Sequence, residues 1–541
     1  MQNILVSLII ICGLTLSSLA NVPHIVFILA DDLGWYDVGF HGSGDIKTPN
    51  IDALAYSGLI LNRYYVAPIC TPSRSALMTA KYPIHTGMQH GVIMGAEPWG
   101  LSLEEKILPE YLQELGYKNH IVGKWHLGHF MKKYTPTFRG FMSHVGFWTG
   151  HQDYYDHTAV ERPYWGMDMR RDLDPAWDLH GQYSTDIFSN EAVKIIEKHN
   201  ASQPLFLYLA HAAVHSANPY NPLPAPDVNV MKFENIKNYK RRRFAAMLSK
   251  LDESVGKIVD TLKQQSMLEN TVIIFSTDNG GPAAGFNENS ASNFPLKGVK
   301  NTLWEGGVRG TGLLWTPKLL NPGRVYNGVM DITDWLPTLL RLVGGNNSFY
   351  SNEIDGINMW DSFNDETLSS SSPRRVVLHN IDDIQGVAAI TVDNWKIVQG
   401  TTYNGNWDGW YGSSSWSLSY DVNEVLESPT GLAVAALGIS ITSQSIEKLR
   451  DELWIDCGIR NNTLAQCQPL KKPCLFNILQ DPCEYNNLAE LYPDVMNNMK
   501  NELNKWNATA ITPRKVKADV RANPELWDHT WNNFGDYLSP I

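Results

Sequence analysis

Cys70 is the cysteine of this 541-residue chain with the clearest potential for chemistry. Of the six cysteines, Cys12 lies in an apolar leader and four others cluster between residues 457 and 483. If those four form disulfide bonds, Cys70 is left over, and an odd cysteine in an oxidising compartment is a buried thiol, an intermolecular link or a reactive group. Arg74 follows by one helical turn, so its guanidinium can point back toward position 70.

Two pairs of oxygen-bearing side chains follow apolar segments that are typical of buried strands. Asp31 and Asp32 come directly after one such segment, and Asp278 and Asn279 come after another. Either pair alone would more often be a surface turn, but adjacent carboxylates repel each other unless a cation is present. Oxygen donors without thiolate or imidazole suit Ca²⁺ or Mg²⁺. We therefore expect a divalent-cation site, and the spacing alone does not choose between these ions.

The segment that begins at Cys70 carries a family resemblance. Residues 70–81, Cys-Thr-Pro-Ser-Arg-Ser-Ala-Leu-Met-Thr-Ala-Lys, resemble the signature of the type I sulfatases, in which Cys-x-Pro-Ser-Arg precedes a Leu-Thr-Gly-Arg-like tail. The resemblance implies that the formylglycine-generating enzyme oxidises Cys70 to formylglycine during secretion. Ala80 and Lys81 stand where the family usually has Gly and Arg, which bears on the efficiency of this conversion.

The resemblance also implies a mechanism and a set of metal ligands. One hydroxyl of the hydrated aldehyde would attack the sulfate ester, and the other would then lose its proton and expel sulfate from the sulfoenzyme. A divalent cation would acidify the hydrate by polarising its bound oxygen. The family's metal ligands match this sequence residue by residue and imply one Ca²⁺ bound by Asp31, Asp32, Cys70, Asp278 and Asn279.

Two lysines match the family positions that bind sulfate. Lys124 lies in Gly-Lys-Trp-His-Leu-Gly, which resembles the family's Gly-Lys-Trp-His motif. Lys300, five residues before Glu305, corresponds to the second lysine, and Lys297 is the nearby alternative. Together with Arg74 these cations would build an anion site within a protein whose net charge is −12.

Two histidines match the family positions that handle protons. His126, in the same motif as Lys124, would lie against the formylglycine hydroxyl and assist the elimination of sulfate. His215 corresponds to the histidine that contacts sulfate and can protonate the leaving oxygen. His211 is the competing candidate, although a lone histidine there would more often be structural.

Alternating strands and helices are expected to position these groups. Residues 25–30, 204–210 and 271–277 are apolar runs typical of buried parallel strands, and residues 239–265 have the apolar spacing of a helix. This alternation predicts an α/β domain with a mostly parallel central sheet, in which ligands bind beyond the carboxyl ends of the strands. The resemblance implies an alkaline-phosphatase-like large domain followed by a smaller C-terminal α+β domain.

The chain is expected to have three parts. Residues 1–20 are typical of a signal peptide, because an apolar stretch too short for a membrane span ends in Ser-Leu-Ala. Residues 21–370 would form the catalytic domain and residues 371–541 the smaller domain with an antiparallel sheet. In this last part the pattern predicts strands and one helix at residues 375–379, 388–392, 395–398 and 493–506. No stretch after the leader is long and apolar enough to cross a membrane.

Modification sites agree with passage through the secretory route, to a lysosome or to the outside of the cell. Four Asn-x-Ser/Thr sequons are candidate glycosylation sites: Asn200, Asn346, Asn461 and Asn507. The late cysteines most simply pair as Cys457–Cys467 and Cys474–Cys483, although four cysteines allow three pairings. The second pair would then close a hairpin over residues 474–483.

The substrate is less well defined. Residues 136–141, 150–155 and 303–310 are similar to animal arylsulfatase B, the N-acetylgalactosamine-4-sulfatase, which implies N-acetylgalactosamine 4-sulfate at the end of a glycosaminoglycan chain. The same scaffold also serves diet-derived sulfate esters such as glucosinolates, and such an enzyme would be secreted into the gut. His151 and Tyr154 are expected to line the substrate pocket.

Two other classes of function are weighed against the sulfatase. A phosphatase or phosphodiesterase would usually carry further Asp and His ligands for a second metal and a Ser or Thr nucleophile. A carbohydrate-binding relative without catalysis would lack some catalytic positions, whereas all of them are filled here. The net charge of −12 also disfavours a nucleic-acid partner.

Overall fold

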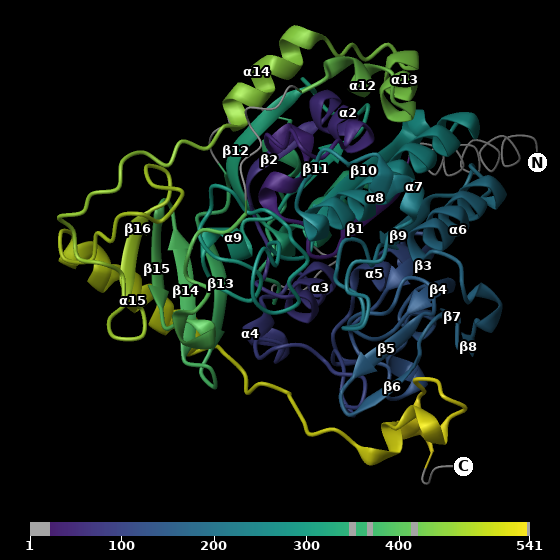
Figure 1. Cartoon of the computed structure of the whole chain (residues 1–541), viewed down its shortest axis with the longest axis horizontal. Coiled ribbons are helices and arrows are strands. Elements are labelled where there is room, and N and C mark those ends of the chain that lie inside the picture. The colour runs from purple at the N-terminus through teal and green to yellow at the C-terminus, as the bar shows by residue number, and fades with distance from the viewer. Residues whose placement is uncertain (1–21, 346–352, 365–371, 413–419, 538–541) are drawn as a thin grey trace, which may run out of the picture.

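The core of the structure is one large mixed sheet. A computed structural model describes residues 22–345, 353–364, 372–412 and 420–537 of the chain, so the expected signal peptide, Cys12 and Asn346 lie outside the described residues. The sheet has the strand order β12-β2-β11-β10-β1-β9-β3-β4-β7-β8 (Figure 1). Its strands are β1 (His24–Ala30), β2 (Leu59–Tyr65), β3 (Lys118–Lys124), β4 (Ser143–Phe147), β7 (Arg170–Arg171), β8 (Asp174–Pro175), β9 (Leu205–Ala210), β10 (Thr271–Thr277), β11 (Gly312–Trp315) and β12 (Arg324–Asp331). The five neighbours β10, β1, β9, β3 and β4 run parallel, which confirms the predicted α/β domain with a mostly parallel centre.

Helices cover both faces of this sheet, because alternate residues of a strand point to opposite sides. Val26 and Ile28 of β1 belong to one buried apolar cluster, and Ile25 and Phe27 belong to the other. The first face packs against α2 (Pro49–Ser57), α6 (Ser184–Lys198), α7 (Asp227–Met231), α8 (Tyr239–Gln264), α12 (Val422–Leu426), α13 (Pro429–Ala436) and α14 (Ser443–Leu453). The second face packs against α3 (Cys70–Thr79), α5 (Leu108–Glu114), α10 (Trp335–Leu342) and α11 (Trp360–Phe363). The helix predicted over residues 239–265 is α8.

The carboxyl ends of four neighbouring strands meet at one edge of the sheet. Ala30 at the end of β1 pairs with Thr277 at the end of β10. Ala210 at the end of β9 pairs with Leu29 on one side and with Gly123 of β3 on the other. The polar residues that follow these strands therefore converge, as the sequence predicts.

A second, antiparallel sheet forms the centre of the smaller domain. Its strands are β13 (Val376–Asp382), β14 (Val387–Val392), β15 (Trp395–Gln399) and β16 (Cys474–Asn477). The strands and helix predicted for this region are present, and the helix is α15 (Pro493–Asn507). The segment from α12 to α14 instead returns to the large domain and joins its core. Two short helices, α4 (Pro83–Thr86) and α9 (Glu305–Val308), lie on the side of the large domain that faces this sheet.

Residues 508–537, here called the C-terminal arm, leave the smaller domain and cross the large one (Figure 1). The arm ends beside a two-stranded hairpin formed by β5 (Thr158–Glu161) and β6 (Tyr164–Met167). The backbone N–H of Asp519 donates to Ala96 O at 2.7 Å, and that of Trp531 donates to Met167 O at 3.0 Å. The arm thus fixes a loop before α5 and the β5–β6 hairpin to the rest of the molecule.

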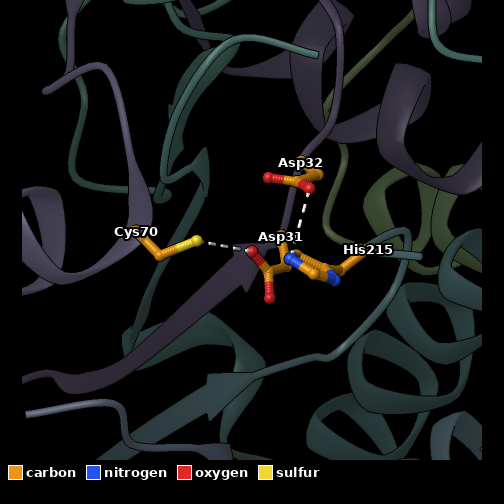
Figure 2. A group of neighbouring side chains, drawn as sticks. All are labelled: Asp31, Asp32, Cys70 and His215. Carbon is orange, nitrogen blue, oxygen red and sulfur yellow. Dashed lines mark hydrogen bonds and ion pairs between the residues drawn. The ribbon is translucent and has the colours of Figure 1, made fainter. Parts of the chain in front are cut away.

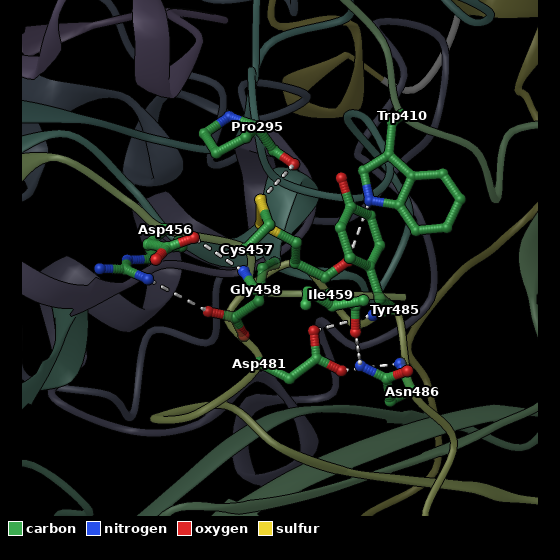
Figure 3. The surroundings of a disulfide bond; sticks show 12 residues. Pro295, Trp410, Asp456, Cys457, Gly458, Ile459, Asp481, Tyr485 and Asn486 are labelled. Atoms are coloured by element: carbon green, nitrogen blue, oxygen red, sulfur yellow. Dashed lines mark hydrogen bonds and ion pairs between the residues drawn. A yellow bond between two sulfur atoms is a disulfide. The ribbon is translucent and has the colours of Figure 1, made fainter. Parts of the chain in front are cut away.

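The disulfide bonds differ from the predicted pairing (Figure 3). The structure joins Cys457 to Cys483 and Cys467 to Cys474, so the predicted pairs Cys457–Cys467 and Cys474–Cys483 are wrong. The expected hairpin over residues 474–483 does not form, because β16 pairs with β15 and the chain then turns away. Cys483 is thereby carried against Trp410, whose indole N–H donates to Cys483 O at 2.9 Å. Cys457, which follows α14, lies next to Cys483 in the fold. The spacing of the cysteines in the sequence does not predict this contact.

Two features bear on passage through the secretory route. Three of the predicted glycosylation sites, Asn200, Asn461 and Asn507, are exposed, and Asn346 lies outside the described residues. Within the described ranges, no helix combines the length and apolar character needed to cross a membrane.

A buried ion-pair group joins the two domains. Lys396 of β15 donates from Nζ to Glu305 Oε1 and lies equally close, at 2.9 Å, to Glu484 Oε1. Glu305 begins α9 of the large domain, whereas the other two residues belong to the smaller one. All three side chains are fully buried. Removing the lysine would leave two carboxylates without their cation in a place that water does not reach.

We expect Lys396→Met to lower the free energy of unfolding by about 3–5 kcal/mol, the usual effect of breaking a buried ion pair. Urea-induced unfolding measures the change. Lys505→Met is the matched control, because Lys505 forms an exposed pair with Glu502 and its loss should cost about 1 kcal/mol or less. Equal effects of the two substitutions would show that the Lys396 group does not hold the domains together.

Candidate active site

Four side chains converge beyond the carboxyl ends of β1 and β9 (Figure 2). Asp31 and Asp32 follow β1, Cys70 begins α3, and His215 lies in the loop after β9. Cys70 Sγ lies 3.6 Å from Asp31 Oδ1, and His215 Nε2 lies 3.5 Å from Asp32 Oδ2. One ligating atom from each of the four residues lies within 4.8 Å of the others. The structure therefore brings together residues that are far apart in the sequence.

Two buried lysines bind the adjacent carboxylates. Lys124 Nζ donates to Asp31 Oδ2 at 2.6 Å, and Lys300 Nζ donates to Asp32 Oδ2 at 2.7 Å. Burial alone would lower the pKa of Lys300, but its attraction to Asp32 outweighs burial and the pKa is raised. Burial raises the pKa of Asp32, and Lys300 opposes that rise. Each lysine thus holds one carboxylate in place while itself remaining near the cavity floor.

Arg74 completes the balance of charge in this cluster. Its Nη2 and Nε donate to Asp278 Oδ2 at 2.9 and 3.1 Å, and its Nη1 donates to the backbone oxygen of Lys124 at 3.2 Å. Burial, followed by repulsion from Asp31, raises the pKa of Asp278. Three cations therefore face three carboxylates, and a bound dication would make the site positive enough to attract an anion.

Asn279 tests whether a metal ion fits here. Its Nδ2 donates to Asp32 Oδ1 at 2.7 Å and to Gly280 O at 3.0 Å. Its Oδ1 is buried and has no hydrogen-bond partner among the described residues, a situation that ordinarily costs about 1–3 kcal/mol. A hard cation would satisfy that oxygen, and the donors around it are carboxylate and amide oxygens of the kind that Ca²⁺ prefers. The residues present therefore fit a calcium ion.

Cys70 is nearly inaccessible, with 2% of its surface exposed. Burial raises the pKa of its thiol to about 12, because the surroundings disfavour the thiolate. Since the thiolate is the reactive form, an unmodified Cys70 would be a poor nucleophile at neutral pH. The raised pKa and the burial agree with the expectation that Cys70 acts in a modified form and not as a free thiol.

The two departures from the family signature leave α3 in place. Ala80 ends the helix in the left-handed conformation, with φ of 57°, and such helix ends favour Gly. The N–H groups of Asp355 and Gly356 both donate to Ala80 O at 2.9 Å and hold this conformation despite the added methyl group. Lys81 forms an ion pair with Glu105 at 2.9 Å.

His126 and His215 each present an unprotonated ring nitrogen. His126 Nε2 lies 3.0 Å from Ile93 O and must donate to it, which leaves Nδ1 as an acceptor with no partner among the described residues. His215 Nδ1 donates to Ser216 O at 2.6 Å, so its Nε2 accepts from Lys300 Nζ at 3.1 Å. Burial lowers the pKa of both rings well below the usual value, and the nearby lysines lower it further.

Cys70, His126, His215 and Lys300 form the floor of a cavity of about 240 Å³, and of the two expected pocket residues one lines this cavity and the other does not. His151 lines the cavity, and its ring stacks on that of His215 with centroids 6.0 Å apart. Tyr154, expected in the pocket wall, lies behind it: its hydroxyl donates to Ala212 O at 2.7 Å and to His215 O at 2.9 Å. These two backbone contacts occupy the Tyr154 hydroxyl, so it supports the loop that carries His215 and does not face the cavity.

The two alternative residues lie away from the floor. His211 is buried behind β9, where its Nε2 lies 3.0 Å from Ser254 Oγ. Lys297 Nζ lies 3.5 Å from the centre of the Trp304 ring, in a different cavity. Neither residue lines the cavity that contains Cys70.

Many residues of the cavity wall are not predicted from the sequence. These residues come from the loop before α5, the β5–β6 hairpin and the loops after β9 and β10, and they include Val92, Met94, Val160, Glu161, Arg162, Ala217, Pro219, Phe286 and Asn287. None lies in a recognisable motif, because their positions depend on loops and on the C-terminal arm rather than on strand ends.

Comparisons with known proteins agree with this geometry. Residues 23–345 match the family model described as Sulfatase. The chain is 40% identical to arylsulfatase J of Mus musculus over 516 residues, which covers 94% of this chain and 80% of that protein. It is 31% identical to N-acetylgalactosamine-6-sulfatase of Homo sapiens over 373 residues, 64% of this chain and 67% of that protein. The crystal structure of Ps i-CgsB in complex with k-i-k-neocarrahexaose superposes with a TM-score of 0.69 at 28% identity, covering 93% of this chain and 97% of that one.

The chain therefore belongs to the sulfatase family. It is an enzyme that hydrolyses sulfate esters, and its large domain has the alkaline-phosphatase-like α/β fold of that family, as predicted. The relatives named above are arylsulfatase J and an N-acetylgalactosamine-6-sulfatase, so the narrower expectation of an arylsulfatase B-like enzyme stays a prediction.

We expect Ca²⁺ to raise the midpoint of thermal unfolding, since an ion that binds only the folded state stabilises it by about 2.7 kcal/mol at 100 times its Kd. Asn279→Ala should abolish most of this shift, because it removes the unpartnered Oδ1. Asn289→Ala is the matched control: Asn289 is buried and donates to Asp32 O at 3.1 Å, but offers no ligand to the cluster. Differential scanning calorimetry with and without Ca²⁺ measures the shift, and an equal response in both variants would contradict the assigned site.

Proposed function

We propose that this sulfatase cleaves the sulfate ester of one sugar-sized alcohol, with N-acetylgalactosamine 4-sulfate as the leading candidate, and that it uses one Ca²⁺ and a formylglycine made from Cys70. The observation that carries the proposal is the position of Cys70, which begins α3 at a cavity floor where Lys124 and Lys300 each bind a carboxylate. A cavity of about 240 Å³ is smaller than those that hold drug-sized ligands, which is why a single sugar unit is proposed.

Two groups would complete the site. The hydrated formylglycine would supply two hydroxyls on one carbon, one to attack sulfur and one to expel sulfate. The calcium ion, held by Asp31, Asp32, Asp278 and Asn279, would supply a Lewis acid for the developing negative charge.

The side chains of this chain then have separate tasks. Lys300 lines the cavity and Lys124 lies just behind its floor on Asp31, which contacts Cys70, so both ammonium groups can bind sulfate oxygens. A bound anion favours the imidazolium form of His215, whose Nε2 can then give a proton to the leaving oxygen. His126 Nδ1, which has a free lone pair, can accept the proton released when sulfate is expelled.

The proposed substrate and location rest on the named relatives and on the modification sites. One relative is named an N-acetylgalactosamine-6-sulfatase, and three short stretches of this chain resemble the N-acetylgalactosamine-4-sulfatase. Exposed sequons and two disulfide bonds agree with folding in the secretory route and delivery to a lysosome or to the outside of the cell. A diet-derived ester such as a glucosinolate remains the alternative substrate.

The competing classes have less support. Cys70, and not Ser or Thr, stands beside Asp31 and Asp32 in the metal-binding cluster, which agrees with a sulfatase rather than a two-metal phosphoesterase. The family's catalytic positions are filled and converge on one cavity, which disfavours a carbohydrate-binding relative without catalysis.

We expect protein from a eukaryotic secretory host to hydrolyse 4-methylumbelliferyl sulfate, and Cys70→Ala to lose at least about a thousandfold in kcat/KM, because covalent catalysis is then impossible. Peptide mass spectrometry of residue 70 in the wild type is the control for conversion. Full conversion with no hydrolysis of aryl or sugar sulfates would refute the proposed function.

The two lysines near residue 300 give a second, matched prediction. Lys300→Ala should lower kcat/KM by about a hundredfold or more, because it removes a charged donor from the anion site. Lys297→Ala should leave kcat/KM within about twofold, since Lys297 lies on Trp304 in another cavity. Steady-state kinetics on the same aryl sulfate measures both, and the reverse order would exchange their roles.

A further inference from the structure

One wall of the active-site cavity is unlike its floor. The floor holds Cys70, His126, His215 and Lys300, whereas the rest of the lining is mostly apolar and includes the polar residues His151, Glu161, Arg162 and Asn287. The apolar lining comes from several loops: Val92, Met94, Val160, Ala217, Pro219 and Phe286. Such a wall suits the carbon face of a ring, and the few polar groups within it determine which ligand is accepted.

Glu161 is the buried carboxylate of this wall. It ends β5, lines the cavity and has 4% of its surface exposed. Its Oε2 accepts a hydrogen bond from the backbone N–H of Gly95, and its Oε1 accepts one from Gly150 N–H at 3.5 Å. Among the described residues it has no cationic partner. Each oxygen has further lone pairs, so Glu161 can accept hydrogen bonds from a ligand.

The environment of Glu161 is unfavourable for a carboxylate without such a ligand. Burial is the largest influence and raises its pKa to about 7, and the carboxylates of Asp168 and Glu97 add to the rise. The backbone N–H groups oppose it only in part. A donor on the substrate would therefore relieve an existing cost, whereas an anionic group on the substrate would be repelled.

We propose that Glu161 is a specificity-determining residue, whose carboxylate accepts a hydrogen bond from a hydroxyl or amide N–H of the sulfated alcohol. The inference rests on the proposed sulfatase function and narrows its substrate class. The preferred leaving alcohol is a sugar ring that carries a hydrogen-bond donor, and not a simple phenol.

The C-terminal arm holds this carboxylate in position. Trp531 of the arm is fully buried, and its indole N–H donates to Ala159 O, two residues before Glu161, at 3.1 Å. A Cβ added at Gly95 would lie 2.8 Å from the Trp531 ring and 2.9 Å from Glu161 Oε2. Trp531 and Glu161 therefore both lie close to Gly95, on the side that a side chain would occupy, which makes Trp531 a positioning residue for the Gly95 N–H bond.

The test compares substrates that differ in the leaving alcohol. The probes are 4-methylumbelliferyl sulfate, whose leaving phenol has no donor, and three sugar-bearing sulfates: N-acetylgalactosamine 4-sulfate, N-acetylgalactosamine 6-sulfate and a glucosinolate. For the wild type, KM for at least one sugar-bearing sulfate should be tenfold or more below that for the aryl sulfate. In Glu161→Gln and Glu161→Ala, that KM should rise by roughly ten- to hundredfold, the usual effect of losing a hydrogen bond to a charged group. KM and kcat for the aryl sulfate should stay within about twofold.

Two matched variants separate recognition from structural support. Asp252→Asn is the control, because Asp252 is also a buried carboxylate that accepts backbone N–H bonds, from Asn50 at 3.0 Å and Ile51 at 2.9 Å, but does not line the cavity. Its kinetics should match the wild type on every probe. Trp531→Phe keeps a ring but loses the bond to Ala159, and should raise KM for the sugar sulfate with little change in kcat.

The failures are distinguishable. Equal losses on aryl and sugar sulfates in the Glu161 variants would overturn the inference and show a structural role. A wild type that cleaves the aryl sulfate but none of the sugar sulfates, or that has the lower KM for the aryl sulfate, would also overturn it, whether or not the variants fold. Absence of all hydrolysis by fully converted enzyme would instead refute the proposed sulfatase chemistry itself.

Discussion

Three buried carboxylates at the edge of one sheet set the main physical constraint on this molecule. Asp31, Asp32 and Asp278 follow neighbouring strands and would repel one another if they were not paired with buried cations. The partners come from three other segments: α3, the end of β3 and the loop before α9. The charge balance thus requires the sheet, the signature helix and the later loops to be assembled together. Arg74 and Cys70 both belong to α3, so the ion pair of Arg74 with Asp278 also places Cys70 beside Asp31. The interaction that balances the buried charges thus also positions the candidate nucleophile.

Two segments that follow the first strands of the smaller domain return to the large domain and pack against it. Helices α12 to α14 come after the first three strands of the smaller sheet in the chain, yet they pack in the core of the large domain. The C-terminal arm then crosses to the far side of the large domain and supports the β5–β6 hairpin. The residues that line the substrate cavity all lie between Ile69 and Lys300, whereas the C-terminal arm supports the β5–β6 hairpin from behind.

The sequence predicts the floor of the site far better than its wall. Continuous apolar runs directly before Asp31 and Asp278 predict buried parallel strands. The carboxyl ends of parallel strands lie at one edge of the sheet, so the polar residues that follow the strands are also predicted to converge. The positions of Lys124, His126, His215 and Lys300 followed from motifs. Tyr154 was misplaced because a tyrosine beside a pocket residue can as easily support the backbone as face the cavity. The sequence did not identify Glu161 or Trp531 as site residues. They come close to each other only in the folded structure, because more than half of the chain separates them. The disulfide pairing failed for the same reason, since proximity in sequence does not fix where a turn carries Cys483.

The burial of Cys70 and the late position of the arm together impose an order on biosynthesis. A side chain with 2% exposure cannot enter the active site of a modifying enzyme, so the conversion of Cys70 that we propose would have to take place before α3 packs into the fold. Residue 70 is synthesised long before residue 531, so that encounter can take place before the arm is made. A chain that ends before the arm would therefore emerge from the ribosome with Cys70 available for conversion but without the segment that holds Gly95 and Glu161. Loss of the last thirty or so residues would then damage recognition of the substrate more than formation of the nucleophile.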